Sequence, residues 1–181
     1  MQDWSTDATR LLYVTGSPTA VFVLDLRSGT RRLVLQRPPN DLWQAQFSPD
    51  NRWIVVLEPL PTTNRTRLWI ARFEDSPTPP DRWVALTGGE HWDDKPRWSP
   101  DGNTIYFVSL RDGFWCLWAQ RLHPATRQPV GPARPVQHFH DARLSMNNTG
   151  FVGLETSLAH DRIVINLGEL SGDIWRTQLQ P

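Results

Sequence analysis

A short polar segment, Glu90 to Trp98 (EHWDDKPRW), holds the densest group of chemically active side chains in the chain. Carboxylates and imidazoles coordinate cations, and carboxylates also pair with the basic side chains of a peptide. In the simpler interpretation, which we favour, the segment is a solvated loop whose aspartates pair with Lys95 or Arg97. The residues that could instead bind a ligand or partner are Glu90, His91, Trp92, Asp93, Asp94 and Arg97.

A second segment, His138 to Arg143 (HFHDAR), has two histidines separated by one residue. On a strand, both imidazoles would point to the same face, which is what a metal site needs. The sequence offers no clear third ligand, so we favour a structural or surface role and assign neither a metal nor any other cofactor. The candidate ligand-binding or partner-binding residues in this segment are His138, His140 and Asp141.

The sequence contains no established catalytic motif. Gly-x-Ser-x-Gly, His-Glu-x-x-His, Cys-x-x-Cys and a phosphate-binding Gly-rich loop are all missing, and the nearest string, Gly168 to Gly172 (GELSG), has leucine at the nucleophile position. The single cysteine, Cys116, lies in an apolar run (FWCLWA), which favours a buried hydrophobic role over a reactive thiol. We therefore expect a protein that is not an enzyme.

The elements that would position these segments are organised around Trp98 to Leu110 (WSPDGNTIYFVSL), a tight turn followed by an apolar strand. Phe47 to Glu58 (FSPDNRWIVVLE) repeats this pattern, and Trp4 to Val14 (WSTDATRLLYV) repeats it more loosely. Proline fixes φ, the aspartate accepts from nearby backbone amides, and glycine or asparagine adopts the left-handed conformation. The pattern predicts that Asp50 and Asp101 are turn residues, not catalytic or metal-binding groups.

Two further strands follow each turn-and-strand pair. One carries an aromatic residue in the strings VFVLDL, LWIARF, CLWAQRL and DIWRTQL, which align at Phe22, Trp69, Trp118 and Trp175. The other appears as RRLVLQ, RWVALT and RPVQHF, at Arg31 to Gln36, Arg82 to Thr87 and Arg134 to Phe139. The chain thus divides into units at 1–40, 41–89, 90–139 and 140–181, within one domain.

Short strands that recur about every 40–50 residues, with proline and glycine at their boundaries, are typical of β-propeller blades. We predict an all-β fold of about four four-stranded antiparallel blades. The last unit is the least regular. We interpret 151–179 as a degenerate blade with a strand over 162–166. A short helix over 142–146 is an alternative that the sequence leaves open. In this arrangement the Glu90 to Trp98 segment precedes an innermost strand and lies near the mouth of the central channel.

Composition excludes some classes of partner. Lysine plus arginine equals aspartate plus glutamate, at 19 each, and no basic stripe indicates nucleic-acid binding. No run is long and apolar enough for a membrane span, and the amino-terminal residues lack the pattern of a signal peptide. The expected partner is a protein or peptide.

The FSPDNRW and WSPDGNTIYFVS stretches and the LW-containing strands that follow them resemble the TolB-type, WD-repeat-like β-propeller family. The resemblance implies a closed ring of about six to eight blades, so a chain of about four is expected to be an open arc or fragment. Open blade faces are apolar, and they imply a partner chain or the missing blades of the same propeller. Light scattering that shows a well-behaved monomer would contradict this expectation. The family also implies a bacterial, extracytoplasmic location such as the periplasm.

The expected function is a non-catalytic module for protein or peptide interaction, or for ligand sensing, within a larger bacterial envelope or signalling protein. One alternative is the gating propeller of a prolyl-oligopeptidase-like serine peptidase whose catalytic domain is not in this chain. Another is a metal-dependent hydrolase, which requires carboxylates and asparagines that converge on the channel axis.

Overall fold

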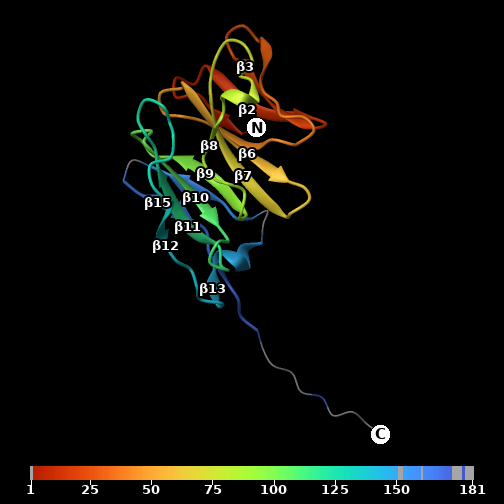
Figure 1. Ribbon diagram of the computed structural model, residues 1–181. Helices are drawn as coiled ribbons and strands as arrows, with labels where there is room; N and C mark the ends of the chain where they lie inside the picture. The colour runs from red at the N-terminus through yellow and green to blue at the C-terminus, as the bar shows by residue number, and fades with distance from the viewer. Residues whose placement is uncertain (1, 151–152, 160, 173–176, 178–181) are drawn as a thin grey trace.

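The computed structural model describes residues 2–150, 153–159, 161–172 and 177 (Figure 1). These residues form three four-stranded antiparallel sheets and two small two-stranded sheets. The sheets follow one another along the chain and are not closed into a ring, as expected for part of a propeller. Among the described residues, no helix has the length and apolar character needed to cross a membrane.

The three large sheets, called blades 1 to 3 below, each run from an innermost to an outermost strand in chain order. Blade 1 comprises β1 (Asp3–Trp4), β2 (Arg10–Gly16), β3 (Thr19–Asp25) and β4 (Arg31–Leu35). Blade 2 comprises β5 (Trp43–Phe47), β6 (Trp53–Leu60), β7 (Arg65–Arg72) and β8 (Val84–Ala85), with a 3₁₀ turn, η1 (Pro80–Arg82), before β8. Blade 3 comprises β9 (Asp93–Trp98), β10 (Thr104–Ser109), β11 (Cys116–Arg121) and β12 (Arg134–Gln137).

Where the structure describes it, the fourth unit forms two small pairs of strands. Its elements are β13 (Leu144–Ser145), the 3₁₀ turn η2 (Met146–Thr149), β14 (Thr156–Leu158), β15 (Ile163–Ile165) and β16 (Gly168–Glu169). β14 pairs with β15, and β13 pairs with β16. The strand predicted over 162–166 is therefore present as β15, whereas 142–146 contains β13 and only the first residue of the 3₁₀ turn η2. Most of the DIWRTQL string, including Trp175, lies outside the described residues.

The aromatic positions occupy matching places in blades 1 to 3, as predicted. Phe22 lies on β3, Trp69 on β7 and Trp118 on β11, each on the third strand of its sheet. Their partners on the second strands are Tyr13, Val56 and Phe107, which also match one another in the repeat. The repeating unit of the sequence is therefore the four-stranded blade.

The Ser-x-Asp turn has the same hydrogen bonds in all three blades. In blade 3, the Ser99 hydroxyl donates to Asp101 Oδ1 at 2.5 Å, and the Asn103 amide donates to the same oxygen at 3.1 Å. Ser48 and Asp50 repeat these contacts in blade 2, and Ser5 and Asp7 repeat them in blade 1. The residue after each aspartate has positive φ: 54° at Ala8, 55° at Asn51 and 69° at Gly102. The aspartates are turn residues, as the sequence predicted.

We expect Asp101→Ala to lower the free energy of unfolding by about 1 kcal/mol, because the hydroxyl of Ser99 and the amide of Asn103 lose a charged acceptor. The same hydrogen bonds hold the pKa of Asp101 below its ordinary value of 3.8. Because the pKa is depressed in the folded state, this stabilisation is present above pH 3.8 and is lost as the pH falls through the folded pKa.

Urea denaturation of both proteins at neutral and acid pH checks this prediction. The control is Asp75→Ala, at an exposed position with no side-chain hydrogen bond described, which should change stability little at either pH. A difference between wild type and Asp101→Ala that grows toward acid pH would contradict the role of the carboxylate.

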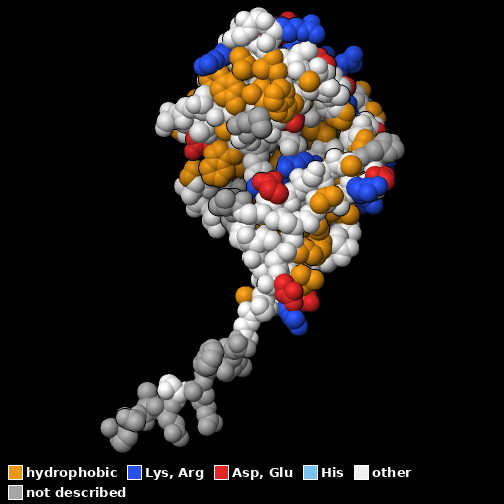
Figure 2. Space-filling model, turned by 180° about the vertical axis from the view of Figure 1, so that it is seen from behind, with side chains coloured by type: hydrophobic (Ala, Val, Ile, Leu, Met, Phe, Trp, Pro, Cys, Tyr) orange, Lys and Arg blue, Asp and Glu red, His pale blue; other side chains and the backbone are white. Residues whose placement is uncertain are grey.

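Apolar side chains fill the spaces between neighbouring blades. Ile54 and Val56 of blade 2 face blade 1, whereas Ile105 and Phe107 of blade 3 face blade 2, and all four are fully buried. The equivalent face of blade 1 carries Leu11, Tyr13, Phe22 and Leu24, which are only half-buried. Figure 2 shows hydrophobic side chains gathered over the end of the molecule where this blade lies. Among the described residues, no sheet covers that face.

Candidate functional site

The innermost strands of the four units surround a hollow on the axis of the arc. Strand β5 contacts β1 and β9, and β9 also contacts β14. The hollow has a volume of about 430 Å³. The described residues that line it are Asp3, Trp4, Thr6, Gln46, Phe47, Ser48, Pro49, Arg97, Trp98, Pro100, Ser157, Leu158 and Ala159. This axial hollow is therefore built by all four units together.

Arg97 lines the axial hollow and is held by residues of the fourth unit. Its Nε donates to the Thr156 carbonyl at 2.7 Å, and its Nη2 pairs with a Glu155 carboxylate oxygen at 3.2 Å. Burial lowers the pKa of Arg97, and the charges of Glu155 and Asp3 oppose that change. The guanidinium is thus a fixed positive group that contacts both β9 and the β14 region.

Asp3 and Lys95 add further charges along the axis. The backbone amide of Phe47 donates to Asp3 Oδ2 at 2.8 Å, and burial nevertheless raises the pKa of this carboxyl. Lys95 Nζ lies 3.2 Å from Glu155 Oε1. An adjoining hollow of about 290 Å³ is lined by Gln2, Gln44, Gln46, Lys95, Arg97 and Glu155. The axis therefore offers hydrogen-bond donors and acceptors together with charges of both signs.

Bulges in the innermost strands turn some side chains toward the axis. The pairing of β5 with β6 shifts register between Trp43 and Gln46. The pairing of β9 with β10 shifts register between Asp94 and Arg97, the stretch that contains Lys95. Gln44 and Lys95 have positive φ, 54° and 51°, within these irregular stretches. A bulge re-aims side chains that strict alternation would place elsewhere. Both residues consequently line the axis.

The expectation that the charged residues of Glu90 to Trp98 gather at the channel mouth is wrong for two of them. Asp93 and Asp94 are already part of the innermost strand and are buried. Asp93 pairs with Arg111 at 2.9 Å, and Asp94 Oδ1 accepts from the Lys95 amide at 2.7 Å. Burial raises the pKa of Asp94. The ion pairs described for Lys95 and Arg97 are with Glu155, and Asp94 contacts Lys95 through the Lys95 backbone amide, so the expected ion pairs with the aspartates are not among those described.

The remaining candidate residues of this segment differ in position and in burial. Arg97 lines the axial hollow, as a ligand-binding interpretation requires. Glu90 is exposed, whereas His91 and Trp92 are half-buried in the loop before β9. None of these three lines either axial hollow. The segment is therefore a buried strand preceded by a loop, not a single polar loop.

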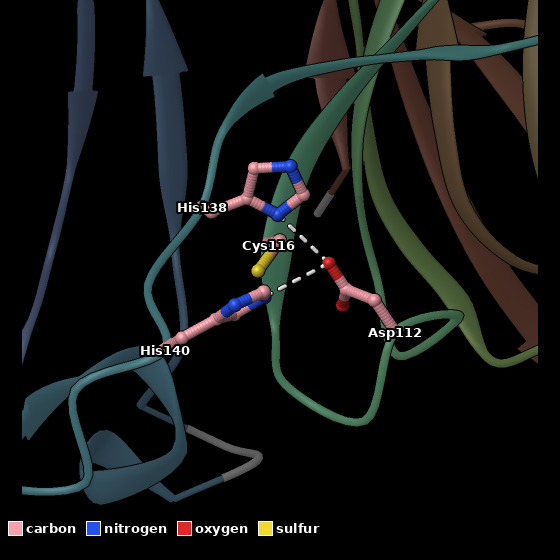
Figure 3. A group of neighbouring side chains, drawn as sticks. All are labelled: Asp112, Cys116, His138 and His140. Atoms are coloured by element: carbon pink, nitrogen blue, oxygen red, sulfur yellow. Dashed lines mark hydrogen bonds and ion pairs between the residues drawn. The ribbon is translucent and has the colours of Figure 1, made fainter.

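The two histidines of the second segment converge on one carboxylate. His138 Nδ1 lies 2.8 Å from Asp112 Oδ2, and His140 Nε2 lies 3.0 Å from the same oxygen. The Cys116 thiol completes the group, and the four potential ligand atoms all lie within 4.8 Å of one another. Figure 3 shows the rings, the thiol and the carboxylate facing a common centre. Asp141 is separate, since its carboxylate accepts from the Arg143 amide at 2.8 Å.

Sequence reasoning found the histidine pair but missed Asp112 and Cys116. Burial raises the pKa of the Cys116 thiol. Burial also favours a higher pKa at Asp112, but hydrogen bonds from His140 and His138 outweigh it and hold the pKa below 3.8. The signal available was strand pairing: with Leu117 opposite Gln137, antiparallel pairing brings Cys116 next to His138.

Comparison with known proteins defines the class of fold. No family model matches the chain. The structure resembles TolB from Acinetobacter baumannii at 16% sequence identity and a TM-score of 0.61, covering 93% of this chain and 40% of that one. It also resembles the β-propeller domain of Myceliophteria thermophila Cps50 (Swd1) at 13% identity and a TM-score of 0.58, covering 91% and 47%.

The structure is similar to peptidases as well. Oligopeptidase B from Trypanosoma brucei matches at 18% identity and a TM-score of 0.59, covering 78% of this chain and 20% of that chain. These likenesses establish a TolB-like, WD-repeat-like β-propeller fold. The chain spans less than half the length of each of these three structures.

Proposed function

We propose that this chain is a non-catalytic β-propeller module that binds an extended peptide segment of a partner protein in its axial hollow. The observation that carries the proposal is the hollow itself, because residues of all four units line it. Its volume of about 430 Å³ falls within the usual range for ligand-binding clefts, about 300–1,000 Å³. By its resemblance, the module would belong to a larger bacterial envelope or signalling protein and act in the periplasm.

The lining suits a peptide. An extended peptide presents backbone donors and acceptors together with side chains, so its site needs polar groups of both kinds and an apolar contact. Arg97 and Gln46 supply polar groups in the lining, and Trp4, Pro49 and Leu158 supply apolar surface. The Trp4 side chain is well placed for such contact because this large hydrophobic residue is 47% exposed.

The same lining supports a binding role without chemistry. Ser48 donates its hydroxyl to Asp50 within the turn, and no histidine is among the described residues that line the hollow. A serine nucleophile would require a neighbouring base. The metal-dependent hydrolase is less favoured, because Asp3 accepts from a backbone amide and Glu155 is paired with Lys95 and Arg97.

The test is selection of a random-peptide phage library on the purified chain, followed by affinity measurements on the enriched peptides. We expect Trp4→Ala to weaken their binding by at least tenfold, as is typical for a tryptophan at the centre of an interface. The matched control is Leu26→Ala, since Leu26 is similarly exposed, at 42%, but does not line the axial hollow.

Two results would argue against the proposed function. One is the absence of any enriched peptide. The other is a set of peptides whose affinity is unchanged by Trp4→Ala, which would place their binding site elsewhere. Circular dichroism of both variants separates loss of binding from loss of structure.

A second candidate function is the gating propeller of a serine peptidase, and the structural similarity to oligopeptidase B favours it. In this case the catalytic serine would lie in a separate domain of the same protein. A fluorophosphonate probe applied to source cells, followed by capture with an antibody against this chain, discriminates the two. Labelling of the captured protein supports the peptidase, and capture without labelling supports the binding module.

A further inference from the structure

We propose that Asp112, Cys116, His138 and His140 form a structural Zn²⁺ site on the outer part of blade 3. This site is separate from the axial hollow and does not depend on the function proposed for it. Its four potential ligand atoms are one carboxylate oxygen, one thiol sulfur and two imidazole nitrogens (Figure 3). Zinc accepts this combination, since cysteine, histidine and aspartate are its usual protein ligands.

The present spacing is close to that of a tetrahedral site. Zinc bonds of about 2.0–2.3 Å place tetrahedral ligand atoms roughly 3.5 Å from one another. The two imidazole nitrogens lie 2.8 and 3.0 Å from Asp112 Oδ2, and no pair in the group is separated by more than 4.8 Å. Movements of about an ångström, within the range of side-chain rotation, would complete the coordination.

The backbone brings the four residues together. Asp112 lies in the turn between β10 and β11, and Cys116 begins β11. The pairing of Leu117 with Gln137 places His138 beside Cys116 at the end of β12. The Phe139 amide donates to Cys116 Sγ at 3.3 Å, which further fixes the thiol against this segment. A metal here would therefore join the outermost strand of blade 3 to the turn between its two central strands.

The donor set favours zinc in a structural role. Thiolate and imidazole together select zinc over magnesium or calcium, which prefer oxygen ligands. Four protein ligands leave no open position for water or substrate, and this is the usual difference between structural and catalytic zinc. The side chains of His138 and His140 are 44% and 48% exposed, so an ion can reach the site from solvent.

The experiment uses Co²⁺ as a spectroscopic substitute and Zn²⁺ as the competing ion, with the full chain in its reduced form. We expect one equivalent of Co²⁺ to give a thiolate-to-metal charge-transfer band, and Zn²⁺ to abolish that band by displacement. Cys116→Ser should remove the band. His140→Ala should weaken Zn²⁺ binding by at least about tenfold.

His91→Ala is the matched control, because His91 is a histidine of the same blade region that is not part of the group. It should leave both the band and the Zn²⁺ affinity unchanged. Because Cys116 is buried and its replacement could affect folding, the exposed His140 variant provides the independent readout. The proposal is overturned if no thiolate band forms, or if His140→Ala binds Zn²⁺ as tightly as the wild type does.

Discussion

Replacing Phe107 with alanine should lower the free energy of unfolding by about 3–5 kcal/mol. The Phe107 side chain is fully buried between blades 2 and 3, in a cluster with Leu57, Leu68 and Ile105. Truncation removes apolar contact from both blades and leaves a cavity that neighbouring sheets can close only in part. Urea denaturation followed by tryptophan fluorescence measures the loss.

Tyr13→Ala is the internal comparison, because Tyr13 occupies the matching place in blade 1 but on the uncovered face. Its ring stacks on Phe22 with centroids 5.7 Å apart and is otherwise half-buried. In the isolated chain we expect a cost of about 1 kcal/mol. An equal cost at the two positions would show that the face of blade 1 is covered in solution, and a concentration-dependent cost would identify a second copy as the cover.

Glu58→Ala should be the other severely destabilising change, at about 3 kcal/mol. Glu58 is 1% exposed and accepts three hydrogen bonds: from Arg37 Nε at 2.9 Å, from Asn40 at 2.6 Å and from Trp69 Nε1 at 2.6 Å. The Arg37 guanidinium also lies over the Trp69 ring, 4.5 Å from its centroid. Without the carboxylate, a buried indole N–H and a partly buried guanidinium both lose their acceptor.

Two variants separate the buried network from ordinary charge effects. Glu58→Gln keeps one side-chain acceptor and should cost less than alanine, about 1–2 kcal/mol. Glu74→Ala removes a carboxylate that pairs with the largely exposed Arg82 at 2.8 Å, and it should change stability by less than about 0.5 kcal/mol. Equal effects at Glu58 and Glu74 in denaturant titrations would refute a network role for Glu58.

The sequence predicted the blades well because the interactions that define them are local. The contacts of Ser99 and Asp101 lie within six residues, and the aromatic residues at Phe22, Trp69 and Trp118 mark the same register in each sheet. These features follow from turn chemistry and strand alternation, which single stretches of sequence display. The last unit also differs from the others in the sequence, since no proline occurs from Val136 to Gln180.

The candidate sites were predictable only in part. The imidazoles of His138 and His140 do face the same group, but both residues follow the end of β12 and do not lie on a strand, and their partner Asp112 is 26 residues away from His138 in the chain. Asp93 and Asp94 were assigned to a solvated loop because a run of charges usually is one, whereas both are buried in the blade, where Asp93 pairs with Arg111 and Asp94 accepts from the Lys95 amide. For Asp93, the partner that reversed the local expectation is Arg111, which lies 18 residues away in the segment after β10.

The sequence by itself determined that the chain is a series of β-blades with structural aspartate turns, because turn geometry and side-chain alternation are set by neighbours along the chain. Only the tertiary structure decided that Trp4, Gln46 and Arg97 share an axial hollow, and that Cys116 joins the two histidines. The physical reason is that both sites depend on register between strands and on the placement of one blade beside the next. Those are fixed by packing across long sequence separations.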